Sequence, residues 1–401
     1  MESNPGSPVP ARVSLVWAVA ACASVLVWQF LTVHYNRQGN WTALFCTGET
    51  KPVPPQLQPG TYVFPGTGYD GQMYRYVAHD PFFQNGVGSY VDNATFRYRR
   101  ILVPALAFLF AAGRQQWVDG AYIAVTSVFI LLGSYWLSRW AVLDGLHPAW
   151  ALAFPLFPAV LISADRMTQD GALTALAVGF AYFVRTKKIA SLYLLLLMAC
   201  LTRESGTVLV AGCIFFELLS KRFARSVIWA TACLPMLAWF WFLHQHVPLM
   251  RSITGVPPFL YRRLGLGIFG AMLHPAHYQL SAVIEMIARS LDVLALIAIV
   301  GALVGALILL RALPLSPISI AAVLYAALVI ALNNSRYWLL IYGYARVFSP
   351  LLVLVAMQAM ALKRSVKAWW WMLLPVPFVG LRVGLQMGEQ VAGVVRGLFG
   401  L

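Results

Sequence analysis

The chain has 401 residues, of which 60% are hydrophobic and only 11% are charged. Its mean hydropathy is +0.72, whereas about a quarter of the residues of an ordinary soluble protein are charged. This composition excludes a soluble globular enzyme, a disordered protein and a fibrous protein. Apolar spans of membrane-crossing length recur along the chain. The sequence therefore predicts an all-α polytopic integral membrane protein.

Basic residues outnumber acidic residues by 29 to 14, which gives a net charge of +15. In a soluble protein this surplus would indicate nucleic-acid binding. Membrane proteins, however, collect Lys and Arg in cytoplasmic loops, and no basic run with interleaved aromatic residues is present to follow a nucleic-acid strand. We therefore expect no nucleic-acid partner, and arginines remain available to bind an anionic substrate.

The predicted elements divide the chain into six parts. The first hydrophobic segment is too long for a signal-peptide core and is interpreted as an uncleaved anchor. A polar loop rich in Pro, Gly and Tyr follows it, and a loop of this length is uncommon unless it is functional. In chain order the parts are a cytoplasmic tail (1–11), the first transmembrane helix (12–34), an outer catalytic loop with interfacial helices (35–116), a transmembrane bundle (117–245), a second outer loop (246–285) and a C-terminal transmembrane bundle (286–401).

About eleven spans are predicted in all. The ten that follow the first loop lie near 117–138, 148–164, 169–185, 189–202, 205–220, 226–245, 286–311, 316–333, 338–361 and 368–386. Lys/Arg clusters near 185–188, 221–225, 311 and 363–367 indicate the cytoplasmic side. The segment 101–113 is too short for a full crossing, so we expect an interfacial or re-entrant helix. The first loop then shares the outer face with the turns that carry acids and isolated arginines.

The most distinctive segment of the first loop is residues 68–83. Gly68 and Gly71 flank Asp70, so a permissive backbone can present this carboxylate at a bend. Two helical turns should follow, ending before Pro81 because a residue that precedes proline disfavours the helical region. We interpret Asp70 as a general base at the membrane interface; the alternative is a structural turn or N-cap aspartate.

Three arginines at 97, 99 and 100 stand on the predicted outer face, against the usual charge bias. They could form a phosphate clamp, since guanidinium groups match phosphate oxygens, or a cluster that snorkels to the headgroups. The turn at 163–170 places Asp165, Arg166 and Asp170 at the membrane edge, where the alternative is a structural pair or a helix cap.

Charged residues at membrane depth are costly and usually face an interior cavity. The tight turn at Arg203-Glu204 and the isolated Arg346 belong to this class, and Arg346 needs a partner or an anionic ligand. Arg336 is an interface-anchor candidate. Two histidine pairs, 244/246 and 274/277, lack a neighbouring carboxylate, so the sequence predicts no histidine metal site. No nucleotide-binding or hydrolase motif is present.

Together these motifs resemble those of the GT-C superfamily of polytopic membrane glycosyltransferases. The resemblance is closest to bacterial members with a Tyr-Asp-Gly-Gln-Phe-Tyr motif, and it covers most of residues 12–350. It is carried by Tyr-Asp-Gly-Gln-Met-Tyr at 69–74, in which Met73 replaces Phe, by His-Asp-Pro-Phe at 79–82, by Arg-Tyr-Arg-Arg-Ile at 97–101, by 165–170 and by Leu-Thr-Arg-Glu-Ser-Gly at 201–206.

The resemblance implies transfer of a sugar from a polyprenyl-phosphate donor to a glycan, lipid or protein acceptor. The reaction would take place on the periplasmic face of a bacterial inner membrane, with Asp70 as the base. Some such enzymes use a divalent metal, Mg²⁺ or Mn²⁺, and others do not. The substrate-binding candidates are Tyr69, Gln72, Tyr74, His79, Asp80, Arg97, Arg100, Asp165, Arg166, Asp170, Arg203, Glu204, Arg336 and Arg346.

The physical requirements of this reaction agree with the residues present. A phosphate leaving group needs cations where charge develops, and inverting attack on the anomeric carbon needs only one carboxylate as base. The alternative functions are a transporter or flippase of lipid-linked saccharides and a non-catalytic scaffold. Transporters usually carry internal repeats, and we find none in this sequence.

Overall fold

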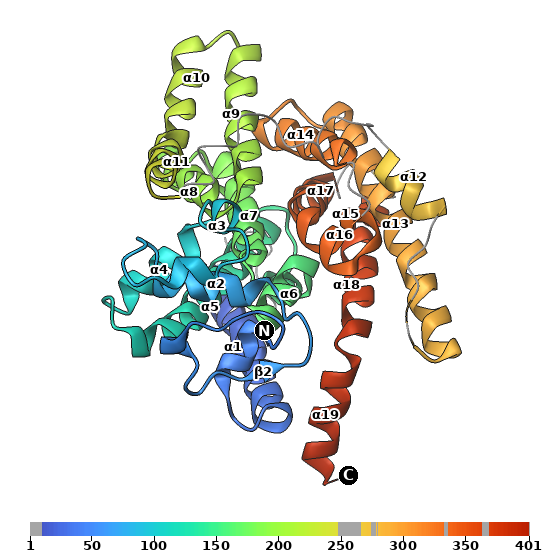
Figure 1. The fold of residues 1–401 in the computed structure, drawn as a ribbon. Helices are drawn as coiled ribbons and strands as arrows, with labels where there is room; N and C mark the ends of the chain where they lie inside the picture. Colours follow the sequence, from blue (N-terminus) through green and yellow to red (C-terminus); the bar gives the residue numbers. More distant parts are fainter. Residues whose placement is uncertain are drawn as a thin grey trace.

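The computed structural model of the chain describes residues 10–247, 266–273, 278, 280–332, 336–362 and 369–400. Helices dominate it throughout (Figure 1). Large apolar side chains on several helices point outward, as for Val16 (66% exposed) and Trp241 (68% exposed). Apolar side chains on the outside are favourable in lipid and unfavourable in water. A helix can cross a bilayer because it satisfies its own backbone hydrogen bonds. The protein is therefore a helical membrane protein.

The first half of the chain contains the predicted loop helices and the first spans. Its helices are α1 (Ala11–Asn36), η1 (Trp41–Phe45), η2 (Pro55–Leu57), α2 (Asp70–His79), η3 (Val87–Tyr90), α3 (Ala94–Arg97), α4 (Leu102–Phe110), α5 (Gln115–Leu143), η4 (Pro148–Leu156), α6 (Pro158–Arg166), α7 (Asp170–Thr186), α8 (Ile189–Thr202), η5 (Glu204–Gly206) and α9 (Thr207–Leu219). Two strands that the all-α prediction did not include, β1 (Thr47–Gly48) and β2 (Val63–Phe64), pair in parallel within the first loop.

The second half is also helical. Its elements are α10 (Phe223–Ala230), η6 (Thr231–Cys233), α11 (Leu234–His246), α12 (Leu266–Leu273), α13 (Ala282–Ala312), α14 (Pro317–Ala331), α15 (Arg336–Leu339), α16 (Ile341–Val347), α17 (Ser349–Leu362), η9 (Trp369–Leu373), α18 (Pro375–Gln386) and α19 (Gly388–Phe399). The predicted second outer loop and the basic cluster at 363–367 fall largely outside the described residues.

Within the described residues, four continuous helices are long and apolar enough to cross a membrane: α1, α5, the helix Phe223–His246 and α13. Two bent pairs, η4 with α6 (63°) and α16 with α17 (49°), raise the number of candidate spans to six. Pro158 and Pro350 lie in the first turn of α6 and α17, where a missing N–H is tolerated. The count of eleven spans stays a prediction.

The short helix that was expected at 101–113 is present as α4. Its nine residues rise about 14 Å, which is less than half of the roughly 30 Å hydrocarbon thickness. Positive φ angles at Ala112 (50°) and Gly113 (71°) then reverse the chain into α5. The first loop and the start of α5 consequently lie at the same end of the molecule.

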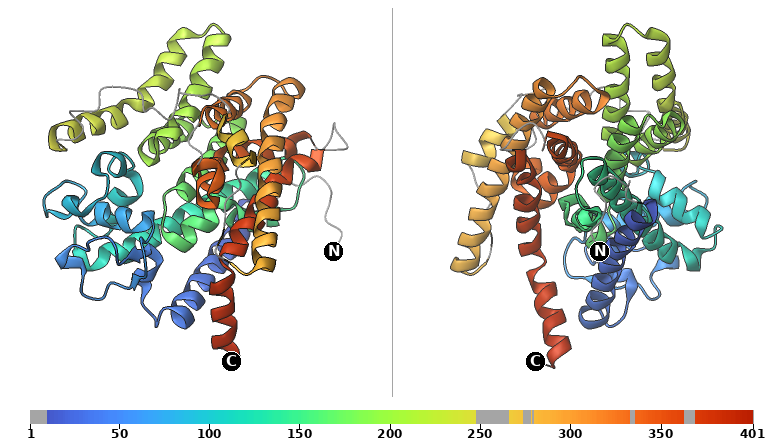
Figure 2. Two further views of the ribbon diagram at one scale, coloured as in Figure 1. Left: turned by 45° about the vertical axis from the view of Figure 1, so that its right-hand side comes forward. Right: turned by 180° about the vertical axis from the view of Figure 1, so that it is seen from behind.

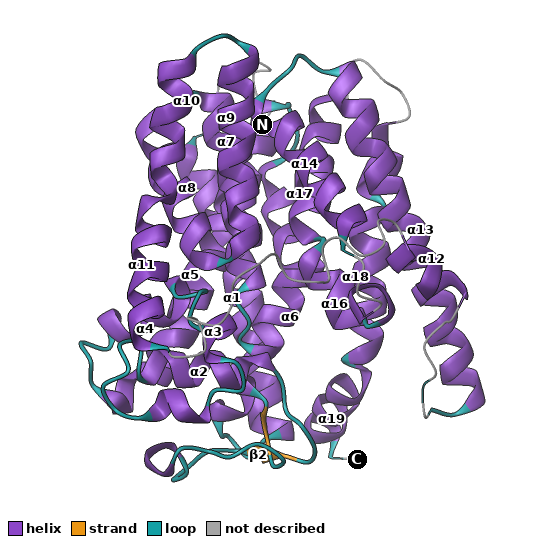
Figure 3. Ribbon diagram, turned by 45° about the horizontal axis from the view of Figure 1, so that its top comes forward, coloured by secondary structure: helices purple, strands orange, loops and turns teal. Residues whose placement is uncertain are grey.

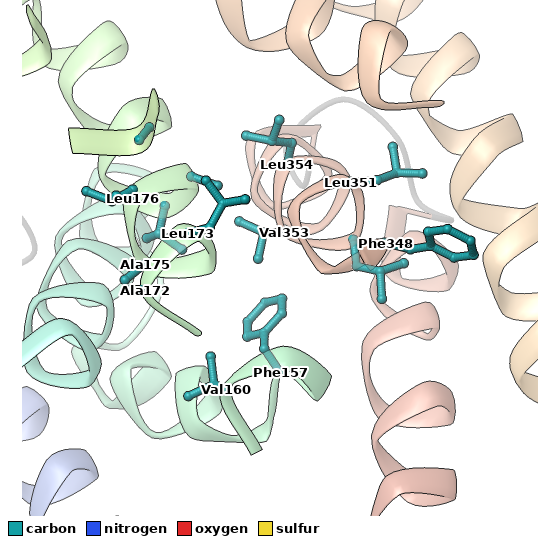
Figure 4. Close-up of a cluster of buried hydrophobic side chains, with 14 of the residues drawn as sticks. Phe157, Val160, Ala172, Leu173, Ala175, Leu176, Phe348, Leu351, Val353 and Leu354 are labelled. Carbon is teal, nitrogen blue, oxygen red and sulfur yellow. The ribbon is translucent and has the colours of Figure 1, made fainter. Parts of the chain in front are cut away.

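Helix α7 forms the centre of the bundle. Its residues from Asp170 to Tyr182 are all buried, and most are small. A Cβ at Gly179 would lie 2.6 Å from the side chains of both Leu195 and Trp136, so glycine lets α5 and α8 approach closely. Figure 4 shows side chains of α6, α7 and α17 meeting in the hydrophobic core. This packing determines where the start of α7 lies relative to α16.

A basic turn lies at the end of the bundle opposite to the first loop. Figure 3 shows the turn between α9 and α10, which carries Lys221 and Arg222, at the end opposite to the first loop with α2 and β2. Helix α18 lies beside α13, and α18 and α19 form a column that reaches the end where α1 meets the first loop (Figure 2). This arrangement agrees with the predicted separation of a lysine-rich face from a face that carries acids and isolated arginines.

Candidate functional site

Asp70 is the first residue of α2, and two glycines allow the backbone to place it there. Gly68 has a φ of +66°, which favours glycine. A Cβ at Gly71 would lie 2.2 Å from the carbonyl oxygen of Arg166, so the first turn of α2 packs directly on the end of α6. The helix ends at His79, before Asp80-Pro81, as predicted.

Both carboxylate oxygens of Asp70 contact guanidinium groups. Arg97 Nη2 lies 2.9 Å from Oδ1, and Arg346 Nη1 lies 2.8 Å from Oδ2. The side chain of Asp70 is 26% exposed. Burial by itself raises the pKa of this carboxyl, but the charges of Arg346 and Arg97 and their hydrogen bonds outweigh it and hold the pKa well below its ordinary range. Asp70 is therefore ionised at neutral pH, and the structure does not use it as a helix cap.

Arg346 joins Asp70 to a second carboxylate. Its Nε donates to Asp170 Oδ2 at 2.6 Å, and its Nη1 also donates to the Tyr69 hydroxyl at 2.7 Å. Arg203 pairs with the other oxygen of Asp170. Three predicted residues from α16, α7 and the α8–η5 turn are thus brought together with the start of α2.

Further ion pairs extend this group along the first loop. Arg97 Nε lies 3.0 Å from Asp92 Oδ1. Arg100 Nε lies 3.1 Å from Glu204 Oε2, and its Nη1 donates to the Tyr74 hydroxyl at 2.9 Å. Tyr74 is fully buried, and although burial raises the pKa of its hydroxyl, the positive charges of Arg100 and Arg97 lower it overall. We call the whole set the acid–arginine cluster: Tyr69, Asp70, Tyr74, Asp92, Arg97, Arg100, Asp170, Arg203, Glu204 and Arg346.

The acid–arginine cluster is balanced in charge. Every one of its four arginines has a carboxylate partner, and every one of its four carboxylates has an arginine partner. The guanidinium of Arg346 occupies the position between Asp70 and Asp170 that a bridging divalent cation would need. Among the described residues, no group of three or more His, Cys, Asp or Glu side chains is placed to hold a metal ion. The donor set around Asp70 therefore does not fit a divalent metal.

Three other predicted residues of the first loop have their own partners, in the loop or at the start of α5. His79 contacts Gln115 at 2.6 Å and Asp119 at 3.0 Å. Asp80 accepts hydrogen bonds from two backbone N–H groups of the following turn, at 2.6 and 3.1 Å. Gln72 binds the hydroxyl of Tyr76 at 2.8 Å and the N–H of Gly48 at 3.1 Å. These contacts hold the loop together, and none of them reaches Asp70.

Asp165 and Arg166 lie beside the acid–arginine cluster rather than within it. They form the structural pair considered as an alternative, with Arg166 Nε 3.2 Å from Asp165 Oδ2. The Arg166 guanidinium also lies over the rings of Tyr69, at 5.2 Å, and Tyr342, at 4.6 Å. The side chain of Arg336, the remaining predicted residue, falls outside the described residues.

Sequence reasoning missed two residues near the cluster, Tyr342 beside Tyr69 and Arg37 in the neighbouring cavity. The ring of Tyr342 packs against that of Tyr69, with 5.1 Å between centroids. Its spacing of four residues from Arg346 was a usable signal, because residues i and i+4 share a helix face. Arg37 follows the first span on the loop side, against the same charge bias that drew attention to Arg97.

Comparison with known proteins finds no similarity on which a family could be assigned: no protein-family model, no curated protein and no solved structure matches the chain. The chemistry of the site therefore has to be argued from the residues and their contacts. Those contacts offer an ionised carboxylate at Asp70, two arginines that orient it, and the hydroxyl of Tyr69 beside the charged groups.

Proposed function

We propose that the protein is a membrane glycosyltransferase of the GT-C type. It transfers a sugar from a polyprenyl-phosphate donor to an acceptor at the face that carries the first loop, with inversion at the anomeric carbon and Asp70 as the general base. The observation that carries this proposal is the Asp70 carboxylate, held ionised by Arg97 and Arg346 at 2.9 and 2.8 Å and still 26% exposed.

Each part of the reaction has a counterpart among these residues. The ionised carboxylate of Asp70 takes the proton of the acceptor hydroxyl as the acceptor oxygen attacks the anomeric carbon. The bond from that carbon to the phosphate oxygen breaks, and the phosphate leaves with the electron pair. The paired arginines orient Asp70, but they also make it a weak base. Proton transfer therefore requires one of these ion pairs to loosen when the substrates bind.

The position of the cluster also supports an enzyme. Asp70 and Arg97 belong to a large loop at one end of the bundle, where a water-soluble acceptor and a lipid-linked donor can meet. In a transporter the same charges would line a path through the bundle, and Asp70 would be structural. Replacing Asp70 separates the two functions, because transfer needs its basicity whereas transport does not.

The test compares wild type with Asp70→Asn and with Glu49→Gln, which alters an exposed carboxylate of the same loop that lies outside the cluster. Each purified full-length protein is incubated with a radiolabelled polyprenyl-phosphate sugar and a crude acceptor extract. We expect wild type and Glu49→Gln to move label from lipid to acceptor, and Asp70→Asn to lose at least 100-fold in rate, the lower range for a general base. Equal transfer by Asp70→Asn would overturn the assignment of Asp70.

A further inference from the structure

A second polar centre lies beside the acid–arginine cluster, at the same end of the molecule. It is a cavity of about 680 Å³ between the end of α1, the first loop and the α18–α19 column. Its charged lining residues are Arg37, Arg166, Arg396 and Glu389, and amide side chains from Asn36, Gln386 and Gln390 complete its polar wall. The cavity is thus predominantly cationic.

Two of these arginines differ from those of the acid–arginine cluster. Within the described part of the chain, neither Arg37 nor Arg396 forms an ion pair. The guanidinium of Arg37 lies over the rings of Phe64, at 4.5 Å, and Tyr62, at 5.7 Å, so aromatic contacts orient it. Arg396 donates to a backbone carbonyl of its own helix, that of Ala392, at 3.4 Å. Arg37 and Arg396 therefore bring two positive charges without an ion pair to the wall of the cavity.

An apolar groove lies along the same helices. It has a volume of about 740 Å³ and is lined by residues of α18, α6, η4, α13 and α17. Its wall reaches Leu161 on α6 and Leu385 on α18, and the cavity wall begins at Arg166 and Gln386 on the same two helices. Leu156 and Leu381, both 58% exposed, border it toward the surrounding lipid.

We propose that this cavity and groove together bind a lipid phosphate. The anionic headgroup contacts Arg37, Arg166 and Arg396, and the single hydrocarbon or isoprenyl chain lies in the groove along α18. Guanidinium groups match phosphate oxygens in charge and geometry, and an apolar groove that borders the bilayer admits the chain without exposing it to water. A sugar phosphate without a chain would leave the groove empty.

The side chain of Tyr69 lies between this site and the arginine that pairs with Asp70. The ring of Tyr69 lies 5.2 Å from the guanidinium of Arg166 and 5.3 Å from that of Arg346. Identifying the bound lipid with the sugar donor rests on the proposed function, whereas the binding site itself does not. The leaving phosphate would then lie apart from the base, as in-line displacement at the anomeric carbon requires.

Binding of radiolabelled farnesyl phosphate to the purified full-length protein in a neutral maltoside detergent tests this site without any transfer reaction. Inorganic phosphate and farnesol serve as competitors that carry only the headgroup charge or only the chain. We expect each to compete at least tenfold more weakly than unlabelled farnesyl phosphate. Equal competition by inorganic phosphate would show an anion site without a lipid groove, and equal competition by farnesol would show a groove without an anion site; either result overturns the proposal.

A double variant and a matched control locate the headgroup of the ligand. Arg37→Gln combined with Arg396→Gln removes both uncompensated charges, and Arg114→Gln removes an exposed arginine at the same end of the molecule but outside the cavity. We expect at least a tenfold weaker affinity in the double variant and no change in the control. Unchanged affinity in the double variant would overturn the headgroup assignment.

The groove is tested with glycines that tolerate a larger side chain. An added Cβ at Gly384 or Gly388 meets nothing within 4 Å, and only Gly384 lines the groove. We expect Gly384→Leu to weaken farnesyl phosphate binding severalfold and Gly388→Leu to leave it unchanged. Equal affinities in the two variants would refute the chain position. Because no acceptor is present, loss of binding and loss of Asp70-dependent transfer are separate results.

Discussion

Arg346 is the residue whose removal we expect to destabilise the acid–arginine cluster most, because one guanidinium joins two carboxylates. Its Nε lies 2.6 Å from Asp170 and its Nη1 lies 2.8 Å from Asp70. Only 8% of its side chain and 3% of that of Asp170 are exposed. Removing one partner of a buried ion pair costs about 3–5 kcal/mol, since the remaining charge stays buried without compensation.

The neighbouring arginines reduce this cost. Asp70 keeps Arg97 and Asp170 keeps Arg203 when Arg346 is replaced. We therefore expect Arg346→Gln to lower the free energy of unfolding by about 3 kcal/mol, the lower end of the range for a buried pair. The measurement is reversible unfolding of the purified protein in mixed detergent micelles, followed by tryptophan fluorescence.

A double-mutant comparison checks the reason for the loss. Adding Asp70→Asn to Arg346→Gln removes the carboxylate that lost its partner, so the two changes should be non-additive by about 1 kcal/mol or more. Arg114→Gln, at an exposed position, should stay within about 0.5 kcal/mol of wild type. A loss below about 1 kcal/mol for Arg346→Gln, which is the value of an exposed pair, would refute the reasoning.

Two further predictions concern Asp70 and its glycine neighbour. Burial raises the pKa of Asp70, but Arg346 and Arg97 lower it by more, so the net pKa is low. The ion pairs of Asp70 therefore stabilise the fold at neutral pH, and this stabilisation is lost only as the pH falls through the low pKa. Arg97→Gln should raise this pKa and move the acid limb of the transfer rate to higher pH; identical pH–rate profiles would contradict this. Gly71→Ala places a Cβ 2.2 Å from a backbone oxygen and should cost about 2 kcal/mol in unfolding free energy. Gly120→Ala in α5, with nothing within 4 Å of the added Cβ, should be neutral or stabilising by up to about 1 kcal/mol, and equal effects of the two changes would argue against the close approach at Gly71.

The sequence alone was sufficient for properties that depend on neighbouring residues. Apolar runs predicted membrane helices, and the residue before Pro81 predicted the end of α2 at His79. The length of the apolar segment at 101–113 predicted a helix too short to cross, which α4 confirms. Asp70 was singled out because acids are rare in this chain and because Gly68 and Gly71 flank it in the sequence.

Only the tertiary structure decided which charges meet. Arg346 and Asp70 are 276 residues apart in the chain, and no local pattern predicts that packing of α7 against α17 brings them into contact. Tertiary packing also gives Arg97 and Arg100, two of the arginines favoured as a phosphate clamp, the carboxylate partners Asp70 and Glu204. It leaves Arg37 and Arg396, from opposite ends of the chain, as uncompensated cations in one cavity. Ion pairing depends on distances of a few ångströms between side chains, and those distances are determined by how the helices pack, not by the order of residues along the chain.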